Sequence, residues 1–297
     1  MRATTDKLAP WVAKSACGRE LDAQLETVEN SGQHGAPQVL RAMALAANGF
    51  AAAPPQADLA LIFGCYRPFS TPDILREVAW IFQTLGVSHT WLEKENCCGL
   101  PMLHQVAAED KPQMLEKARG YVRGNTTAAA QKGAARLAYC CAGCAQAALG
   151  ATASASDAGS NSVAGETPAR HDYILDVLLD ALAGRALQVA PIKVAYFEGC
   201  HTSYKRHFRQ VDLNWQRYRQ FLDSVAGLTV VDIARGRCCK MQPKSILAAA
   251  QEAQADALVC ACSGCNGSLK PLGRGKIRVM SYTGLLAQAL GGMPATL

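Results

Sequence analysis

Ten cysteines of this 297-residue chain repeat one pattern twice, and their thiols are the groups that this spacing could bring to chemistry. The first copy, called the first motif, consists of Cys65, Cys97, Cys98, Cys141 and Cys144. The second copy, called the second motif, consists of Cys200, Cys238, Cys239, Cys262 and Cys265. Cysteine thiolates are ligands of zinc and of iron–sulfur clusters. Five thiols in the same order twice therefore predict two metal or iron–sulfur sites built by one duplicated unit.

The spacing within each motif narrows the chemistry. A Cys-x-x-Cys on a tight turn lets two sulfurs converge, and Gly143 and Gly264 are expected to supply the positive φ of that turn. Adjacent cysteines suit two neighbouring irons better than one tetrahedral ion, and Gly99 after the first pair would let backbone approach a bulky cluster. Five thiols also exceed the four that zinc or a cubane cluster requires, which indicates an unusual cofactor.

Other interpretations of the cysteines remain open at this stage. All ten could be zinc ligands or buried free thiols, or zinc could occupy one motif only. Cys140 and Cys260 stand just before each Cys-x-x-Cys and are interpreted as buried strand residues rather than ligands.

Composition limits the function classes. The formal charge is +6, but no basic cluster is interleaved with aromatic residues, so nucleic-acid binding is not expected. We expect no signal peptide, and the sequence contains no run of about 20 apolar residues. So many cysteines in such a chain favour metal ligation in a reducing compartment, and we expect a cytoplasmic protein.

A short predicted strand precedes each cysteine group in both motifs. The predicted strands cover residues 59–63, 87–92, 136–139, 193–197, 228–233 and 257–259. The predicted helices cover residues 37–48, 72–85, 107–132, 171–183, 204–225, 245–255 and 281–290. The helix over 107–132 is expected to break near Gly120 or Gly124.

This alternation predicts an α/β fold made of two pseudo-repeated Rossmann-like units with mostly parallel sheets, preceded by a helical N-terminal extension. The expected domains are the extension at 1–57, the first cysteine-rich unit at 58–149, a flexible linker at 150–170 and the second unit at 171–297. Open parallel sheets bind ligands at the carboxyl edge of their strands, where the cysteines are expected to lie.

The duplicated pattern Cys-x31-Cys-Cys-Gly…Cys-x-x-Cys resembles the cysteine-rich (CCG) domain of the heterodisulfide reductase B-like family, over about residues 58 to 290. The resemblance implies that each motif holds a noncubane [4Fe-4S] cluster through its five cysteines, and that a disulfide is split between two clusters. It also implies a ferredoxin-like iron–sulfur subunit and a flavin-containing subunit as partners.

The second motif departs from the family pattern. Lys240 stands where Gly99 stands in the first motif, and 22 residues separate the cysteine pair from the Cys-x-x-Cys, against 42 in the first. Zinc in one site therefore stays an alternative. Lys240 could stabilise a thiolate or the reduced state, and His201, beside Cys200, could deliver a proton to a leaving thiol.

Two functions follow from this interpretation. The first is the catalytic subunit of a heterodisulfide reductase-like oxidoreductase, which reduces or forms a disulfide or related sulfur substrate. The second is an electron relay between a flavoprotein dehydrogenase and quinone or another carrier. The basic residues on the predicted helix over 204–225 are interpreted as a solvated face, with docking to an anionic partner or a peripheral membrane contact as the alternative.

Overall fold

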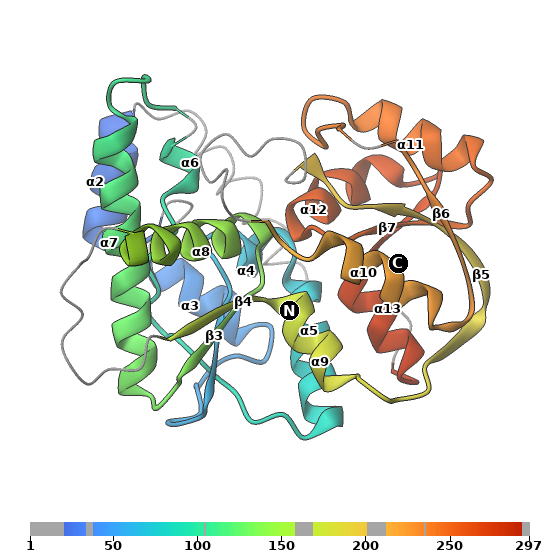
Figure 1. The fold of residues 1–297 in the computed structure, drawn as a ribbon, viewed down its shortest axis with the longest axis horizontal. Coiled ribbons are helices and arrows are strands. Elements are labelled where there is room, and N and C mark those ends of the chain that lie inside the picture. Colours follow the sequence, from blue (N-terminus) through green and yellow to red (C-terminus); the bar gives the residue numbers. More distant parts are fainter. Residues whose placement is uncertain are drawn as a thin grey trace. The chain divides into compact units, whose positions relative to one another are not determined.

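The computed structural model describes residues 21–33, 38–103, 105–157, 169–200, 212–234 and 236–292 (Figure 1). The described chain forms two four-stranded parallel sheets with helices packed against them. The first sheet consists of β1 (Leu59–Ile62), β2 (Thr90–Trp91), β3 (Arg136–Tyr139) and β4 (Arg170–Tyr173). The second sheet consists of β5 (Gln188–Phe197), β6 (Ala226–Asp232), β7 (Ala257–Cys260) and β8 (Arg278–Ser281). The predicted α/β class with mostly parallel sheets is confirmed.

The two sheets have the same topology. The strand order is β2-β1-β3-β4 in the first sheet and β6-β5-β7-β8 in the second, and every pairing is parallel. In both sheets the chain adds one strand on one side of the first strand and then crosses to the other side. The order therefore reverses between β1 and β3, and again between β5 and β7. Such reversal points are where open α/β sheets bind ligands.

Helices precede, connect and follow the parallel strands. Those before β4 are α2 (Leu21–Ser31), α3 (Gln38–Ala46), α4 (Arg67–Ser70), α5 (Pro72–Leu85), α6 (Leu100–Leu103), α7 (Lys111–Gln131) and α8 (Ala142–Asp157). Those after β4 are α9 (Ile174–Ala181), α10 (Trp215–Asp223), α11 (Pro243–Glu252), α12 (Ser263–Gly273) and α13 (Tyr282–Ala289). Amphipathic patterning places α5 as predicted, and Gly86 ends it at a φ of +69°.

The chain divides into two compact units, each with its own sheet. The first unit contains the first sheet up to Tyr173, and the second contains most of the chain from Ile174 onward. Residues 76–87, which include most of α5, group with the second unit although they precede the rest of it in sequence. There the hydroxyls of Ser281 and Thr283 each donate a 2.6 Å hydrogen bond to Glu77 Oε2.

The fourth strand of the first sheet is an element that the sequence pattern does not predict. The pattern predicts a helix over 171–183, but residues 170–173 form β4 and the helix begins only at Ile174. The polar sequence of β4 is stabilised by charge pairing, because Asp172 accepts hydrogen bonds from Arg136 (2.6 Å) and Arg170 (3.0 Å). Ion pairs thus replace the apolar alternation that marks an ordinary strand.

Three further expectations differ from the structure. α7 is continuous, so the predicted break near Gly120 or Gly124 is wrong. α8 runs to Asp157, so the first residues of the predicted linker are helical, and residues 158–168 lie outside the described part of the chain. Of the helix predicted over 204–225, the structure describes α10, whose Trp215, Tyr218 and Leu222 are buried as the pattern predicts.

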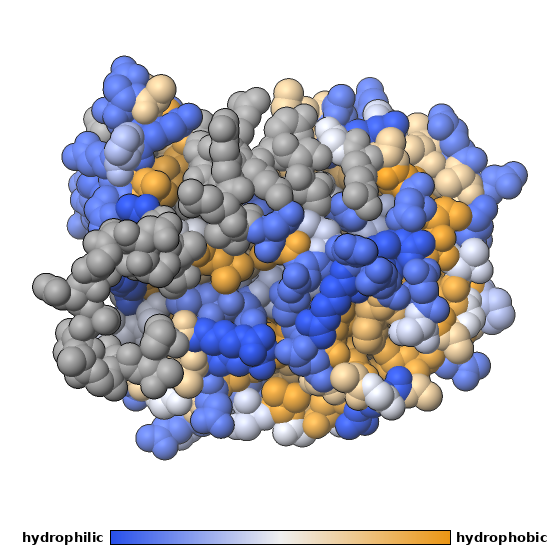
Figure 2. Space-filling model, viewed as in Figure 1, coloured by the Kyte–Doolittle hydropathy of each residue, from blue (hydrophilic) through white to orange (hydrophobic). Residues whose placement is uncertain are grey.

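The described arginines of α10 are paired with carboxylates. Arg217 Nη2 lies 2.6 Å from Asp180 Oδ1, and Arg219 lies 2.6 Å from Asp223 and 2.8 Å from Asp232. Figure 2 shows hydrophilic residues gathered over this helix. These contacts support the interpretation of a solvated charged face.

Candidate metal centres

Both motifs lie at the carboxyl edges of the strands, at the point where each sheet reverses its order. Cys65 follows β1 and Cys141 follows β3, while Cys200 follows β5 and Cys262 follows β7. The adjacent cysteines of each motif follow β2 and β6. Three neighbouring strands thus deliver the five thiols of a motif to one edge of a sheet, as the sequence predicts.

The register at this edge is the same in both copies. The N–H of Cys140 donates to the carbonyl of Ile62 at 2.9 Å, and the N–H of Ala261 donates to the carbonyl of Phe197 at 3.1 Å. Each bond fixes the end of the strand before the Cys-x-x-Cys against the end of the strand before the single cysteine. The two motifs therefore have equivalent backbone supports.

The first motif is a continuous chain of sulfur contacts. Cys65 Sγ lies 3.7 Å from Cys97 Sγ, Cys97 contacts Cys98, Cys98 contacts Cys144, and Cys144 contacts Cys141. Cys141 is half-buried and the other four thiols are buried. Excluding water from closely spaced thiols is what a sulfur-ligated centre requires, because thiolates there are stabilised by the metal rather than by solvent.

The surroundings of Cys98 favour ionisation of its thiol. Hydrogen bonds from the thiols of Cys144 and Cys97, and a bond from the N–H of Leu100, hold the pKa of Cys98 well below its ordinary value despite burial. The pKa of Cys97 is raised, because its thiol donates to Cys65 and Cys98 and is buried. The arrangement already favours one thiolate among the five.

The second motif repeats the arrangement in a more exposed form. Cys200 contacts Cys238, and Cys265 contacts both Cys239 and Cys262. The hydrogen bond from Cys265 is the main cause that lowers the pKa of Cys239 to about 7, against the opposing effect of burial. Burial and the nearby thiols raise the pKa of Cys200 to about 12. Cys239 therefore corresponds to Cys98 both in sequence and in its tendency to ionise.

Glycines at positive φ make room for the sulfurs. Gly64 (φ +81°) and Gly199 (φ +100°) each precede the single cysteine of a motif. A Cβ at Gly64 would lie 3.3 Å from Cys144 Sγ, and a Cβ at Gly199 would lie 3.0 Å from Cys265 Sγ. Both glycines thus combine a backbone conformation that side chains disfavour with a close approach to a thiol.

The glycines inside the two Cys-x-x-Cys sequences do not have the predicted conformation. Gly143 and Gly264 lie within α8 and α12 at ordinary helical φ, so the predicted positive φ at these positions is wrong. The Cys-x-x-Cys instead spans the start of a helix. Cys262 is the N-cap of α12 and Cys265 lies in its first turn, so the two thiols occupy the same helix face three residues apart.

Gly99 does have a positive φ, of +77°, but it packs against the helix α7. A Cβ there would lie 2.6 Å from the Cβ of Ala118 on α7. Lys240, at the corresponding position of the second motif, is exposed and does not have a positive φ. The backbone conformation that requires a glycine in the first motif is therefore not repeated in the second. Lys240 favours the Cys239 thiolate electrostatically.

Three other candidate residues are His201, Cys140 and Cys260. His201 lies outside the described residues. Cys260 is the last residue of β7 and Cys140 directly follows β3, and both are fully buried. Burial raises the pKa of both thiols well above the ordinary value, which keeps them protonated.

A buried ion pair supports the first motif and was not predicted. Arg41 Nη2 of α3 lies 2.9 Å from Glu95 Oε2, and both side chains are fully buried. The same carboxylate oxygen accepts a 3.0 Å hydrogen bond from the N–H of Phe63, just before Gly64 and Cys65. The signal in the sequence was a single arginine within the apolar helix, on the face that also carries Ala44 and Leu45.

The N-terminal segment and α7 hold the loop that carries the adjacent cysteines. The N–H of Cys97 donates to the carbonyl of Gly32 at 2.6 Å. Asn125 of α7 accepts from the N–H of Asn96 at 2.6 Å and donates to its carbonyl at 2.9 Å. Val28 of α2 packs in one apolar cluster with Cys65 and Cys97. The extension thus packs on the first motif.

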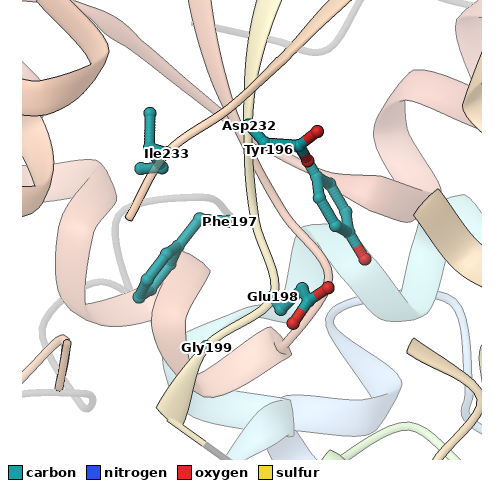
Figure 3. A pocket seen from close by; sticks show the side chains of 6 residues that line it. All are labelled: Tyr196, Phe197, Glu198, Gly199, Asp232 and Ile233. Atoms are coloured by element: carbon teal, nitrogen blue, oxygen red, sulfur yellow. The ribbon is translucent and has the colours of Figure 1, made fainter. Parts of the chain in front are cut away.

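A small pocket lies at the carboxyl edge of the second sheet, beside the second motif. It is lined by Tyr196, Phe197, Glu198, Gly199, Asp232 and Ile233. Tyr196 and Phe197 extend to opposite sides of β5, as neighbours on a strand do (Figure 3). The pocket includes Gly199, which precedes Cys200 and approaches the thiol of Cys265.

The donor set fits a sulfur-ligated centre. Each motif offers five mostly buried thiols, one of them prone to ionise, next to a glycine that keeps a side chain away. Within the described ranges, no three His, Cys, Asp or Glu side chains close around a single metal ion. None of the helices in the described part is long and apolar enough to cross a bilayer.

Comparisons with known proteins find a family match for one segment of the chain. No curated protein matches this sequence significantly. The solved structures with some likeness include an aspartate racemase homologue from Pyrococcus horikoshii OT3, which is 10% identical, with a TM-score of 0.33 over 78% of this chain and 96% of that chain. The family model of the CCG cysteine-rich domain matches residues 59–147, which carry the first motif. Residues 59–147 therefore match the CCG cysteine-rich domain, the domain present in heterodisulfide reductase B-like proteins.

Proposed function

We propose that this protein is the catalytic iron–sulfur subunit of a heterodisulfide reductase-like oxidoreductase, which reduces or forms a disulfide or a related sulfur substrate. The observation that supports the proposal most is the gathering of each quintet of thiols at the reversal point of its own sheet. The CCG cysteine-rich domain over residues 59–147 supports an iron–sulfur cofactor for the first motif. In this proposal each motif holds one [4Fe-4S] cluster of the noncubane type.

The chain's own residues would have distinct tasks. When bound, the clusters would supply one electron each to the two-electron cleavage of an S–S bond and Lewis-acid stabilisation of the sulfurs. The ten thiols would hold the irons. Lys240 would stabilise negative charge beside Cys239, and His201 would deliver a proton to the leaving thiol. A ferredoxin-like subunit and a flavin-containing subunit would supply or accept the electrons.

Metal and sulfide analysis of anaerobically purified protein tests the cofactor. About eight irons and matching acid-labile sulfide per chain support two clusters, whereas zinc in place of iron would reject the proposal. Two variants assign the metal to its motif: Cys141→Ser with Cys144→Ser, and Cys262→Ser with Cys265→Ser. Each pair is expected to halve the iron, and Cys140→Ala is the matched control that leaves it unchanged.

The catalytic role needs a separate test. The oxidised protein is incubated with candidate thiols and followed by electron paramagnetic resonance. A new signal that depends on the thiol supports binding of a sulfur substrate at a cluster. Identical spectra with every thiol, in protein that contains its full iron, would contradict the catalytic role.

A relay of electrons is the second candidate, and a specific asymmetry favours it. The CCG family match ends at residue 147, and the second motif has the shorter spacing and Lys240 in place of the glycine. A relay functions with a single cluster, whereas a pair that splits a substrate requires two. About four irons per chain, all lost in the variant of the first motif, would support the relay.

A further inference from the structure

The start of α12 carries two buried polar side chains whose hydrogen-bonding groups have no partner among the described residues. Asn266 is 0% exposed, and neither its amide oxygen nor its amide nitrogen is bonded. Ser263 is 4% exposed, and its hydroxyl is likewise unbonded. A buried polar group without a partner costs about 1–3 kcal/mol, so these two side chains call for a partner that the described residues do not provide.

Both side chains belong to the helical turn that carries the Cys-x-x-Cys of the second motif. Ser263 directly follows Cys262, and Asn266 directly follows Cys265. The N–H of Asn266 donates to the carbonyl of Cys262 at 3.1 Å, which closes the first turn of the helix. Residues four apart on a helix share a face, so Asn266 lies on the face of Cys262. The helix thus brings two unbonded polar groups and two thiols to the same end.

The first motif has methyl groups at the equivalent places. Counting from the first cysteine of each Cys-x-x-Cys, Ala142 corresponds to Ser263 and Ala145 corresponds to Asn266, and both alanines are fully buried. The sheets have the same order and the strand ends the same register, so this difference is chemical rather than architectural. Of the two copies, the second thus has the more polar surroundings at its Cys-x-x-Cys.

A further contact points in the same direction. The hydroxyl of Ser268 donates to the Cys239 thiol, whereas the equivalent residue of the first copy is the buried Ala147. The first motif has instead the buried carboxyl of Glu95 close to Cys98. Glu95 is paired with Arg41, so the clearer difference between the two copies is the hydroxyl donor of Ser268 beside Cys239.

We propose that Ser263 and Asn266 donate hydrogen bonds to the group held by the second motif, and that they make it the more easily reduced of the two centres. This inference rests on the proposed function, because it requires a reducible centre in each motif. Hydrogen bonds toward the sulfurs of a cluster raise its reduction potential, since they stabilise the electron that reduction adds. The step adds one electron, and no bond in the protein forms or breaks.

The first test is a redox titration, with dithionite as the reductant and paramagnetic resonance as the readout, in full-length chains that keep only one intact motif. The second centre is expected to have the higher potential. Ser263→Ala and Asn266→Ala are each expected to make reduction about tenfold less favourable, which is a fall of about 59 mV for a one-electron couple. Ser263→Thr keeps the hydroxyl and is expected to keep the potential. Ala142→Ser is the converse variant and is expected to raise the potential of the first centre.

The second test separates a ligand contact from ordinary packing. In the metal-free protein the Ser263 hydroxyl is buried without a partner among the described residues, so Ser263→Ala is expected to leave the denaturation midpoint unchanged or to raise it. In the metal-loaded protein the same variant is expected to lower the midpoint. A side chain that only packs would shift both midpoints in the same direction.

The outcomes distinguish this inference from the proposed function. Full iron in both motifs, with potentials that neither Ser263→Ala nor Asn266→Ala changes, would overturn the inference and leave the proposed function standing. A higher potential at the first centre would do the same. A second motif that binds no iron would overturn the inference together with the two-cluster function.

Discussion

Replacing Arg41 by methionine tests how the first motif is supported. The variant removes the cation that faces Glu95 while both positions stay fully buried. Breaking a buried ion pair on one side costs about 3–5 kcal/mol, because the remaining charge is left without compensation. Glu95 Oε2 also accepts the N–H of Phe63 at 3.0 Å, so the strain falls on the segment that leads to Cys65. We expect loss of iron from the first motif alone.

The pH dependence of this variant follows from the same carboxyl. Burial raises the pKa of Glu95 above 4.5, against the opposing effect of Arg41. A carboxyl whose pKa is higher in the folded state than in the unfolded state contributes its full stability at pH values below the unfolded-state pKa. This contribution is lost as the pH rises through the folded-state pKa. Without Arg41 the pKa rises further. The penalty of Arg41→Met is therefore expected to grow with pH, by at most about 1.4 kcal/mol per unit.

The assay is urea denaturation of the metal-free protein, followed by circular dichroism at several pH values. Lys117→Met is the matched control, because Lys117 pairs with Glu29 at 2.6 Å but the two side chains are 40% and 50% exposed. Such a surface pair contributes about 0–1 kcal/mol. Adding Glu95→Gln to Arg41→Met removes the titrating charge and is expected to recover part of the loss and to flatten the pH dependence. Equal costs for Arg41→Met and Lys117→Met would refute this reasoning.

Three further predictions follow from the described contacts. Gly199→Ala is expected to lower the free energy of unfolding by about 1–2 kcal/mol, because its φ is positive. It is also expected to lower the iron content of the second motif, because the new Cβ would lie 3.0 Å from Cys265 Sγ. An unchanged iron content would contradict a role of Gly199 in making room for that sulfur. Burial lowers the pKa of His171 to about 4 from 6.5, so stability is present above pH 6.5 and falls by up to about 3 kcal/mol as the pH drops toward 4; His171→Gln should flatten that slope in urea titrations. Cys260→Ala is expected to retain the iron content of the parent protein, because the Cys260 thiol is kept protonated by burial; loss of iron on metal analysis would assign it as a ligand.

The sequence was sufficient for the features that depend on local chemistry. Apolar runs predicted β1, β3 and β7, and the motifs lie at the strand ends where the parallel sheet requires them. The α8 and α12 helices were missed because they begin inside the Cys-x-x-Cys, where glycine indicated a turn. β4 was missed because its stability comes from Arg136, 36 residues away from Asp172 in sequence.

The supports of the first motif illustrate the same limit. Arg41 and Glu95 are far apart in the chain, and the apolar face that carries Arg41 does not reveal which acid it meets. Only the tertiary fold buries them together, next to the segment that leads to Cys65. Likewise, a glycine before a cysteine does not reveal its φ, and the importance of Gly64 and Gly199 depends on a thiol that approaches from another part of the chain.

The assignment of residues 76–87 to the second unit has a consequence for any attempt to dissect this molecule. A fragment that starts after β4 would contain Ser281 and Thr283 but not the carboxylate of Glu77 that accepts from both. The hydroxyls of Ser281 and Thr283 would then lack their acceptor. The apolar side chains of the second unit that pack against α5 would be exposed to water. Each sequence repeat is thus shorter than the body it builds, and a cut between the repeats would yield an incomplete C-terminal half.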